Sequence, residues 1–390
     1  MLGAVRDWHE DDDDMPFLAQ GYAGTGKTYL AQHIAGEMGL GAAYLAPTGK
    51  ATAVLRSKVA DAHAITTIHG AIYAPVVKDP ERYAELEQLC ETETRRRLVE
   101  KYRREMRNLA QPGWSCRKGF VWQHENWEGQ HGKPKGACKL IVVDEASMVG
   151  ARVGEDLMKL ARRHDLRVVA IGDFAQLPPI GDTAFFSEAN CIAAPEMDEI
   201  VRQRAGSPIL DLATHVRHGD RPIPGDHGDE LRVYPTDWND RIYDQIICGR
   251  NVTRHKINDS FRAAFGHSRK LPQPGEPMIV LRNNHGLKIV NGDVFRVVDC
   301  ERADDGALWL RGQFDDSRAI WFAAVREEDG EPKNGETPVG YAYAITCHKA
   351  QGSEFDSVLV FDESRVFGRD ASRWRYTAIT RARQHLTLTR

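Results

Sequence analysis

The chain has 390 residues, 42% of them hydrophobic and 28% charged, and a formal net charge of -4. These values are typical of a soluble globular protein with two or three domains, and no apolar stretch approaches the roughly 20 residues that a membrane span needs. The negative charge argues weakly against a nucleic-acid partner, although such binding depends on local clusters of charge. The seven cysteines are odd in number and the N-terminal segment lacks an apolar signal core, so we expect free thiols in a reducing compartment.

Strands and helices are predicted to alternate at the start of the chain. We expect a strand at residues 17–19, a Gly-rich turn at 21–28 and a helix at 29–38, where apolar residues recur with helical spacing. A strand at residues 42–45 and a helix from Ala51 follow. This βαβ order predicts the α/β fold class, with a parallel sheet and helices on its faces.

The alternation stops after Tyr73. Residues 74 to about 137 contain a charged segment, predicted as one helix at 81–109, and then a stretch rich in Gly and Trp. We interpret these residues as an insertion. Strands resume at residues 139–143 and 167–171.

A second α/β unit is expected to begin near Ile192. It contains a strand at residues 244–248 and a helix at 252–265, and the short strands and turns of residues 277–325 predict a small β-barrel. Strands at 341–345 and 357–361 and a C-terminal helix complete the unit. The expected domains are therefore residues 1–182, interrupted by 74–137, and residues 183–390, interrupted by about 277–335.

The stretch GYAGTGKT at residues 21–28 fits the pattern G-x-x-x-x-G-K-[ST] between a predicted strand and a predicted helix. Glycines in such a loop let backbone N–H groups surround phosphates, and the helix N-terminus adds positive potential. Lys27 would reach the β- and γ-phosphates and Thr28 would hold Mg²⁺, whereas the alternative is a Gly-rich turn that matches by chance. The predicted cofactor-binding residues of the loop are Gly21, Ala23, Gly24, Thr25, Gly26, Lys27 and Thr28.

Two acids end the next apolar strand, in the stretch KLIVVDEAS at residues 139–147. Asp144 is expected to hold Mg²⁺, directly or through water, and Glu145 to act as the general base on the attacking water. The alternative is a pair of solvated acids after a buried strand. The phosphate loop upstream argues against that alternative, so the two motifs together predict a nucleoside-triphosphatase that uses ATP and Mg²⁺.

The stretch GDFAQLPPIG at residues 172–181 follows an apolar run that predicts a strand. Its prolines cannot continue the strand, so a stiff loop presents Asp173 and Gln176 at the strand's carboxyl end. We expect this strand to lie beside the one that ends at Val143, with both carboxyl ends at one ligand-binding crevice. Gln176 would then lie near the γ-phosphate, and the two prolines would transmit a shift there to the rest of the loop.

At this stretch the chain resembles superfamily 1 DNA helicases, in the branch typified by Dda and RecD, whose motif III reads G-D-x-x-Q-L-P-P. Other stretches resemble the family's remaining motifs in the family's order. They are APTGKATAVL at residues 46–55, TIHG at 67–70, DEAS at 144–147, DEIVRQ at 198–203, AYAITCHKAQGSEFDSVLV at 342–360 and YTAITRAR at 376–383. The resemblance spans almost the whole chain, and several motifs in order are far more specific than one alone.

The resemblance implies two RecA-like domains with ATP between them. Arg202 and Arg381 would be arginine fingers from the second domain, and such groups stabilise the charge on the γ-phosphoryl oxygens in the transition state. A surface salt bridge is the alternative for Arg202. Gly352 and Glu354 would contact the nucleotide.

The resemblance also implies a track for single-stranded DNA. The residues facing the strand would be Thr48, Lys50, Thr67 and His69 on the first domain and Thr346, His348 and Lys349 on the second. Asn258 and Arg262 fit the family less tightly, and a structural role is their alternative.

The insertion at residues 74–137 would correspond to the family's pin, which splits the duplex. Its basic run at residues 95–107 would grip phosphates or form a solvated helix face. Four aromatic residues would stack on the duplex end or form a small core, namely Trp114, Phe120, Trp122 and Trp127. Zinc is not expected at Cys116, His124, His131 and Cys138, because their spacing is wider than in zinc fingers. The barrel would be the family's SH3-like domain.

We therefore expect an ATP-dependent DNA helicase that moves 5′→3′ on single strands and acts at junctions of single and double strands. It would work as a monomer in the cytoplasm of a bacterium or a phage-infected cell, with no membrane contact. A single-strand-binding protein or a replication or recombination protein would be a partner. The alternatives are an ATP-switched DNA clamp that does not unwind and an RNA helicase of the viral superfamily 1 type. The family's adenine-reading glutamine would precede Met1, which leaves nucleotide preference open.

Overall fold

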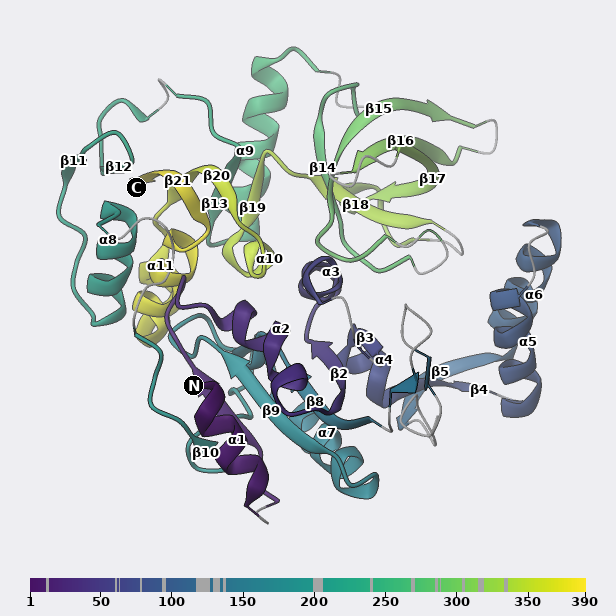
Figure 1. Cartoon of the computed structure of the whole chain (residues 1–390). Helices are drawn as coiled ribbons and strands as arrows, with labels where there is room; N and C mark the ends of the chain where they lie inside the picture. Colours follow the sequence, from purple (N-terminus) through teal and green to yellow (C-terminus); the bar gives the residue numbers. More distant parts are fainter. Residues whose placement is uncertain are drawn as a thin grey trace.

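Two mainly parallel sheets and a closed barrel form the framework of the protein (Figure 1). In Figure 1 the first sheet lies in the lower half, the second at the upper left and the barrel at the upper right. The computed structural model describes residues 1–11, 14–59, 62, 64–77, 79–92, 96–116, 127–128, 134–135, 138–198, 206–238, 241–267, 271–284, 287, 289–303, 306–314, 319–332 and 336–390.

The first sheet is entirely parallel and is buried on both faces. Residues that alternate along its central strands enter two different apolar clusters, as Leu45 and Ile141 do on one face and Tyr44 and Val142 on the other. This two-sided burial explains the continuous apolar runs of the sequence. The strands, in spatial order, are β10 (Ile192–Ala193), β1 (Phe17–Gln20), β9 (Arg167–Gly172), β8 (Cys138–Val143), β2 (Gly41–Ala46) and β3 (Ala64–Thr67).

Helices cover both faces of this sheet. Apolar residues of α1 (Leu2–Glu10), α2 (Lys27–Glu37) and α3 (Gly49–Lys58) fill the cluster on one face. Those of α4 (Ile68–Ile72) and α7 (Ala151–Arg163) fill the cluster on the other, and a short 3₁₀ turn, η2 (Ala146–Met148), precedes α7. The βαβ order expected from the sequence is confirmed, including the parallel pairing of β8 with β9.

The insertion contains a helical hairpin, so the prediction of one helix over residues 81–109 is wrong. β4 (Tyr73–Val77) pairs antiparallel with β5 (Ala110–Cys116), which places Val77 opposite Ala110. The chain between these partners must reverse, and it does so as α5 (Pro80–Thr92) and α6 (Arg96–Leu109). Arg82 and Glu105 join the two helices by an ion pair of 2.8 Å. The described part of the insertion also contains β6 (Trp127–Glu128) and β7 (Pro134–Lys135).

Several sequence predictions for the insertion fall outside the described part of the protein. Phe120, Trp122, His124 and His131 are not among the described residues, and neither are the side chains of Trp114, Cys116 and Trp127. The stacking and zinc hypotheses for these residues therefore stay as they were stated. Cys138 is described, and it begins β8 as a buried thiol.

The second sheet also has mainly parallel strands. In spatial order they are β11 (Gly225–His227), β12 (Leu231–Val233), β21 (Ala382–Thr389), β20 (Phe355–Phe361), β13 (Gln245–Cys248) and β19 (Ala344–Thr346), with only β11 antiparallel to its neighbour. The elements around it are α8 (Pro208–Arg217), α9 (Asn251–Ala264), α10 (Cys347–Ala350), the 3₁₀ segment η6 (Ser364–Asp370) and α11 (Ala371–Ile379).

Three expectations for the second unit are corrected. The unit does not begin near Ile192, because that residue pairs with Phe17 in the first sheet, and the preceding Phe186 is buried in the same core as α7. The chain does not close on a helix, since β21 follows α11 and buries Leu386 and Leu388 between β12 and β20.

The third correction concerns the strand predicted at residues 341–345. Asn258 of α9 bonds to the carbonyls of Tyr341 and Ala344 and to the N–H of Ala344, so the strand is broken there. The first piece ends β18 in the barrel, and the second is β19 in the sheet. Asn258 and Arg262 are thus structural, and the Arg262 guanidinium pairs with the buried Glu276 at 2.7 Å.

The predicted barrel is confirmed. Its five strands close around an apolar interior that includes Phe295, Phe314 and Phe322. They are β14 (Pro277–Val280), β15 (Val294–Arg302), β16 (Leu308–Phe314), β17 (Ala319–Arg326) and β18 (Thr337–Tyr341), with the 3₁₀ turn η5 (Glu327–Asp329) before the last. The α/β fold with an added barrel agrees with the sequence prediction.

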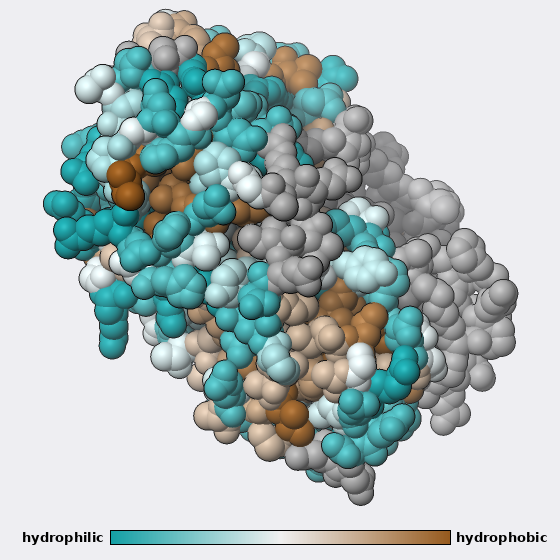
Figure 2. All heavy atoms as spheres, turned by 60° about the vertical axis from the view of Figure 1, so that its left-hand side comes forward, coloured by the Kyte–Doolittle hydropathy of each residue, from teal (hydrophilic) through white to brown (hydrophobic). Residues whose placement is uncertain are grey.

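The face of the molecule in Figure 2 is mainly hydrophilic, and its apolar side chains lie in separate patches. Among the residues that the structure describes, no helix is both long enough and apolar enough to cross a membrane.

Candidate active site

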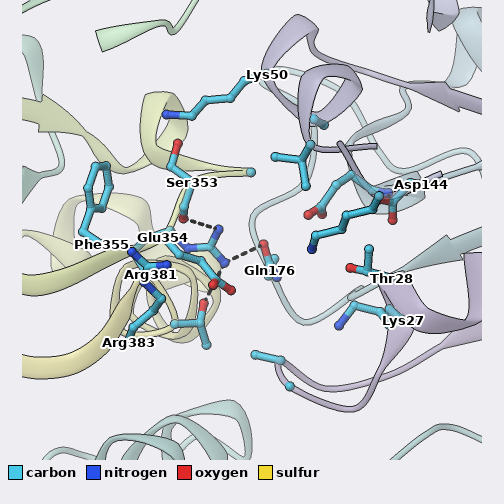
Figure 3. A pocket seen from close by; sticks show the side chains of 18 of the residues that line it. Lys27, Thr28, Lys50, Asp144, Gln176, Ser353, Glu354, Phe355, Arg381 and Arg383 are labelled. Atoms are coloured by element: carbon cyan, nitrogen blue, oxygen red, sulfur yellow. Dashed lines mark hydrogen bonds between the residues drawn. The ribbon is translucent and has the colours of Figure 1, made fainter. Parts of the chain in front are cut away.

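A cleft of about 900 Å³ lies between the two sheets (Figure 3). On the first side, loops that follow the parallel strands line it, which is where open α/β sheets bind ligands. On the second side, the lining residues lie just before or at the start of β13, β20 and β21. Most of the predicted nucleotide-site residues meet here, with Ala23, Gly24, Gly26, Lys27, Thr28, Asp144, Glu145 and Gln176 on the first side and Gly352, Glu354 and Arg381 on the second. The other two predicted residues of the phosphate loop, Gly21 and Thr25, are buried.

The phosphate loop joins the end of β1 to the start of α2. Gly24 and Gly26 both have φ of 85°, a left-handed conformation that glycine adopts without strain. The Lys27 ammonium donates to the carbonyls of Gly21 at 2.9 Å and Tyr22 at 2.6 Å. Burial lowers the pKa of Lys27, although the nearby Asp173 charge opposes this shift. The loop thus holds its lysine close to the backbone that would surround a phosphate.

The two acids follow β8 in a strained turn. Glu145 has φ of 52° and ψ of 41°, a left-handed conformation that is uncommon for a residue with a side chain and that occurs at functional sites. The Asp144 carboxylate accepts a hydrogen bond from the Glu145 N–H at 2.9 Å. Burial, followed by the charge of Glu145, raises the pKa of Asp144 to about 7.

Oxygen ligands for a divalent cation are present in the cleft. Thr28 and Asp144 lie on the same side of it, as Figure 3 shows, and hydroxyl and carboxylate oxygens suit Mg²⁺. Within the described ranges, no group of at least three His, Cys, Asp or Glu residues could hold a metal ion. A magnesium ion here would therefore depend on phosphate oxygens for further ligands, as is usual for this ion.

Arg381 reaches the cleft from the second sheet. Its guanidinium donates to the carbonyls of Thr377 at 3.0 Å and Ser353 at 3.1 Å, and Nη2 lies 3.5 Å from Gln176 Oε1 (Figure 3). A contact between Gln176 and a guanidinium from the other sheet links the two halves at the position expected for a γ-phosphate. The other predicted finger, Arg202, lies outside the described residues.

The loop that carries Gln176 has further bonds to the second half. The Leu177 N–H donates to the Thr377 hydroxyl at 2.9 Å, and the Gln351 amide donates to the Leu177 carbonyl at 3.1 Å. This loop is therefore held from both sides of the cleft, as its predicted role in transmission requires.

The predicted DNA-contact residues occupy several environments. Thr48 and Thr67 cap α3 and α4, because their hydroxyls accept hydrogen bonds from the N–H groups of Ala51 and Gly70. Thr346 lies at the N-cap of α10, although its side chain makes no capping bond.

Among the basic members of this set, His69 is exposed, whereas His348 and Lys349 are half-buried. Burial lowers the pKa of His348 and of Lys349. Lys50 lines the nucleotide cleft itself, with its ammonium 5.8 Å from the centre of the Phe355 ring on the opposite side.

Sequence reasoning missed part of the site. Besides Lys50, the lining of the cleft includes Ala51, Val54, Ser57, Lys58, Asp244, Ser353, Phe355, Asp356, Thr380 and Arg383. It also missed Tyr376 and Arg217, which contact Asp173 across the cleft. Tyr376 is the first residue of the motif YTAITRAR, so its motif position was the available signal, but its contacts were not.

The family follows from a comparison with known proteins. The model of the AAA domain family matches residues 4–234, and that of the UvrD-like helicase C-terminal domain matches residues 341–389. The chain belongs to the AAA domain family. The first match covers the phosphate loop, both acids and Gln176, and the second covers Gly352, Glu354 and Arg381. The resemblance to superfamily 1 helicases of the 5′→3′ branch is confirmed.

Curated relatives share about a quarter of their aligned residues with this AAA-domain chain. The ATP-dependent RecD2 DNA helicase of Deinococcus radiodurans is 28% identical over 63% of this chain and 35% of its own length. The RecBCD subunit RecD of Mycolicibacterium smegmatis is 27% identical over 63% of this chain and 48% of its own. The ATP-dependent DNA helicase Pif1 of Bdellovibrio bacteriovorus is 24% identical over 56% of this chain and 59% of its own. The chain thus spans half or less of the first two relatives.

Solved structures share the fold. A structure of Bacteroides Pif1 bound to single-stranded DNA superposes with a TM-score of 0.58 and 18% identity, covering 100% of this chain and 91% of that one. Pif1 at forked double-stranded DNA gives a TM-score of 0.59, again with 18% identity and coverage of 100% and 91%. The arrangement of two sheets and a barrel is therefore that of the Pif1 structures.

Proposed function

We propose that this protein is an ATP-dependent DNA helicase that moves 5′→3′ along single strands and unwinds duplex DNA. The observation that carries the proposal is the contact of Arg381 with Gln176 across the cleft. This contact brings a phosphate loop, a pair of acids and a guanidinium from the opposite sheet into one cavity. Hydrolysis in such a cavity depends on how the two halves meet, which is what a motor requires.

The chemistry assigned to the cleft is hydrolysis of the bond between the β- and γ-phosphates. Lys27 would exchange the carbonyls of Gly21 and Tyr22 for phosphate oxygens, and Glu145 would take the proton of the attacking water. Arg381, and Arg202 with it, would stabilise charge on the γ-phosphoryl oxygens, an effect worth about 10³–10⁵ in rate for arginine fingers. Thr28 and Asp144 would hold Mg²⁺, which neutralises phosphate charge when it is bound. Gly352 and Glu354 would contact the nucleotide from the second half.

The proposed DNA track runs over the loops that follow β2, β3 and β19. Thr48, Thr67 and His69 would contact the strand from the first half, and Thr346, His348 and Lys349 from the second. Lys50 lines the cleft, and we propose that it also contacts the DNA strand. Relatives are named as DNA helicases, and Pif1 of this fold has been seen on single-stranded DNA, which supports DNA as the substrate.

Several further properties belong to the same proposal. The boundary expected at residue 182 would lie after β10, because that strand pairs with β1 in the first sheet. The first RecA-like domain would contain the insertion at 74–137 as its pin, and the second, which extends to residue 390, would contain the SH3-like barrel at about 277–335. We propose that the protein acts as a monomer in the cytoplasm, alongside a single-strand-binding protein or replication and recombination proteins.

A strand-displacement assay tests the proposal. We expect displacement of a labelled strand from a duplex with a 5′ single-stranded tail, in the presence of ATP, and little from one with a 3′ tail. Poly-dT should stimulate ATP hydrolysis more than poly-U does. Stimulated hydrolysis without displacement would indicate a DNA clamp, and preference for poly-U would indicate an RNA helicase; either result would contradict the proposal.

A further inference from the structure

Asp173 is fully buried in the loop after β9, and both halves of the protein hold its carboxylate. From its own loop it accepts hydrogen bonds from the Ala175 N–H at 3.2 Å and from Gln176 Nε2 at 3.3 Å. From the second half it accepts one from the Tyr376 hydroxyl at 2.6 Å and one from Arg217 Nη1 at 3.0 Å. Hydrogen bonds to a charged acceptor are short and strong, so this carboxylate is a firm junction between the halves.

The Tyr376 hydroxyl also bonds to the phosphate loop. It accepts a hydrogen bond from the Ala23 N–H at 3.0 Å while it donates to Asp173. Burial, followed by the charge of Asp173, raises the pKa of Tyr376, so the hydroxyl keeps the proton that it donates. A single side chain of α11 therefore touches both the phosphate loop and the loop that carries Gln176.

Arg217, at the end of α8, supports the same junction. Its guanidinium carbon lies 3.8 Å from the centre of the Tyr22 ring in the phosphate loop, and Nη2 donates to Glu196. Because α8 packs on α11, Arg217 and Tyr376 approach the phosphate loop from one rigid pair of helices.

Arg381 is fastened to the helix that carries Tyr376. Its Nε donates to the carbonyl of Thr377, the residue after Tyr376, at 3.0 Å. A displacement of Tyr376 from the phosphate loop would therefore displace the Arg381 guanidinium as well. Misplacing a catalytic group by about 1 Å can cost about 100-fold in rate.

We propose that Tyr376 is a positioning residue: by bonding to Asp173 and Ala23, it sets the distance between the phosphate loop and Arg381. This inference rests on the proposed function, since it concerns the same ATPase site. It predicts that loss of the hydroxyl slows the chemical step without removing any group that touches the nucleotide. Arg217 assists by holding the Asp173 carboxylate from the other side.

The test uses Tyr376→Phe and a matched control. Tyr234→Phe removes a hydroxyl that also donates to a carboxylate, Asp362, at 2.6 Å, but away from the cleft. With the full chain and poly-dT present, we expect Tyr376→Phe to lower kcat about tenfold with little change in KM, as loss of one charge-assisted hydrogen bond implies. Tyr234→Phe should keep the kcat of the wild type, even though we expect both substitutions to lower the melting temperature.

Combination with Arg381→Ala shows through which residue Tyr376 acts. If it acts through Arg381, adding Tyr376→Phe to Arg381→Ala should lower kcat little further, because the two effects are not additive. An undiminished effect in that background, or a kcat for Tyr376→Phe equal to that of Tyr234→Phe, would overturn the inference. If Tyr376→Phe is unfolded at the assay temperature, the same cycle is measured at a lower temperature at which the variant is folded, with the same expected loss.

The wild-type rate separates this inference from the proposed function. If the wild-type protein binds ADP but does not hydrolyse ATP, both the proposed function and the positioning role of Tyr376 are contradicted. An active wild type whose Tyr376→Phe variant is equally active contradicts the positioning role alone.

Discussion

At the scale of single residues, the chemistry of the cleft depends on side chains in unusual environments. Glu145 has a left-handed backbone in spite of its side chain, and Asp144 beside it has a raised pKa. Such features have a cost in stability, and proteins retain them where they serve a reaction. The two acids are therefore the residues whose substitution should separate binding from turnover most clearly.

We predict that Glu145→Gln keeps nucleotide binding and loses turnover. The amide preserves the size of the side chain but cannot accept the proton of the attacking water, so kcat should fall by about 10²–10⁴-fold. Steady-state ATPase assays and titration with a fluorescent ADP analogue measure the two properties. Glu155→Gln, on the exposed side of α7, is the control and should have wild-type values. Retained turnover in Glu145→Gln would mean that another group is the base.

At the scale of elements, one buried carboxylate joins the second sheet to α11. Asp362, just after β20, accepts hydrogen bonds from the Tyr234 hydroxyl after β12 at 2.6 Å and from Arg375 of α11 at 2.8 Å. Burial alone would raise its pKa, but hydrogen bonds from Ser364, Tyr234 and Arg375 outweigh burial and lower it. The bond from Arg375 thereby joins α11, which carries Tyr376, to the end of β20, and the Tyr234 hydroxyl is not part of that link.

We predict that Asp362→Asn destabilises the fold at neutral pH by about 2 kcal/mol, because hydrogen bonds to a charged group are lost. A lowered carboxyl pKa stabilises the folded state above the ordinary value of 3.8, and this stabilisation is lost as the pH falls through the folded pKa. The difference between variant and wild type should thus be constant from about pH 5 to 8 and should shrink below about pH 4. Urea denaturation at several pH values measures it.

The control for this prediction is Asp165→Asn. Asp165 pairs with Lys139 at 2.9 Å, but its side chain is 93% exposed. Exposed pairs contribute about 0–1 kcal/mol, so this variant should change stability little at any pH. Equal losses in the two variants would contradict the role assigned to Asp362.

At the scale of the whole molecule, the barrel touches the first unit at a close contact. A Cβ atom added to Gly49, the first residue of α3, would lie 2.6 Å from Val290 Cβ, in the connection between β14 and β15 of the barrel. Figure 1 shows α3 directly below the barrel, between it and the first sheet. Gly49 lies between Thr48 and Lys50, so the barrel is placed against a stretch of the proposed DNA track.

We predict that Gly49→Ala weakens this docking through a steric clash with Val290. Overpacking of this kind costs about 1–3 kcal/mol, and Val290→Gly, which removes the Cβ atom that is met, should restore part of it in the double variant because the two side chains are coupled. Melting temperature and DNA-stimulated ATPase activity measure the effect. Gly36→Ala, in α2, is the control, since an added Cβ there meets nothing within 4 Å and should not destabilise. Additive changes in the double variant would contradict a direct contact.

Much of the fold and of the candidate site could be predicted because it is encoded between neighbouring residues. Apolar periodicity predicts β8, β9 and α2, and the glycines at 24 and 26 identify the phosphate loop. Local sequence patterns gave a wrong prediction where the structure depends on pairing with a distant part of the chain. The charged segment of α5 and α6 has helical composition throughout, and only the pairing of β4 with β5 shows that it must fold back.

The sequence by itself determined the α/β order, the phosphate loop and the set of strand ends that carry polar side chains. Only the tertiary structure decided which of those side chains meet. Asp173 and Tyr376 are 203 positions apart, and Ala23 and Tyr376 are 353 apart. No periodicity or turn preference links residues so distant, because such contacts depend on which packed surfaces face one another. The loop GDFAQLPPIG could be recognised from its residues, but its attachment to the second half arises from the packing of α11 against the cleft.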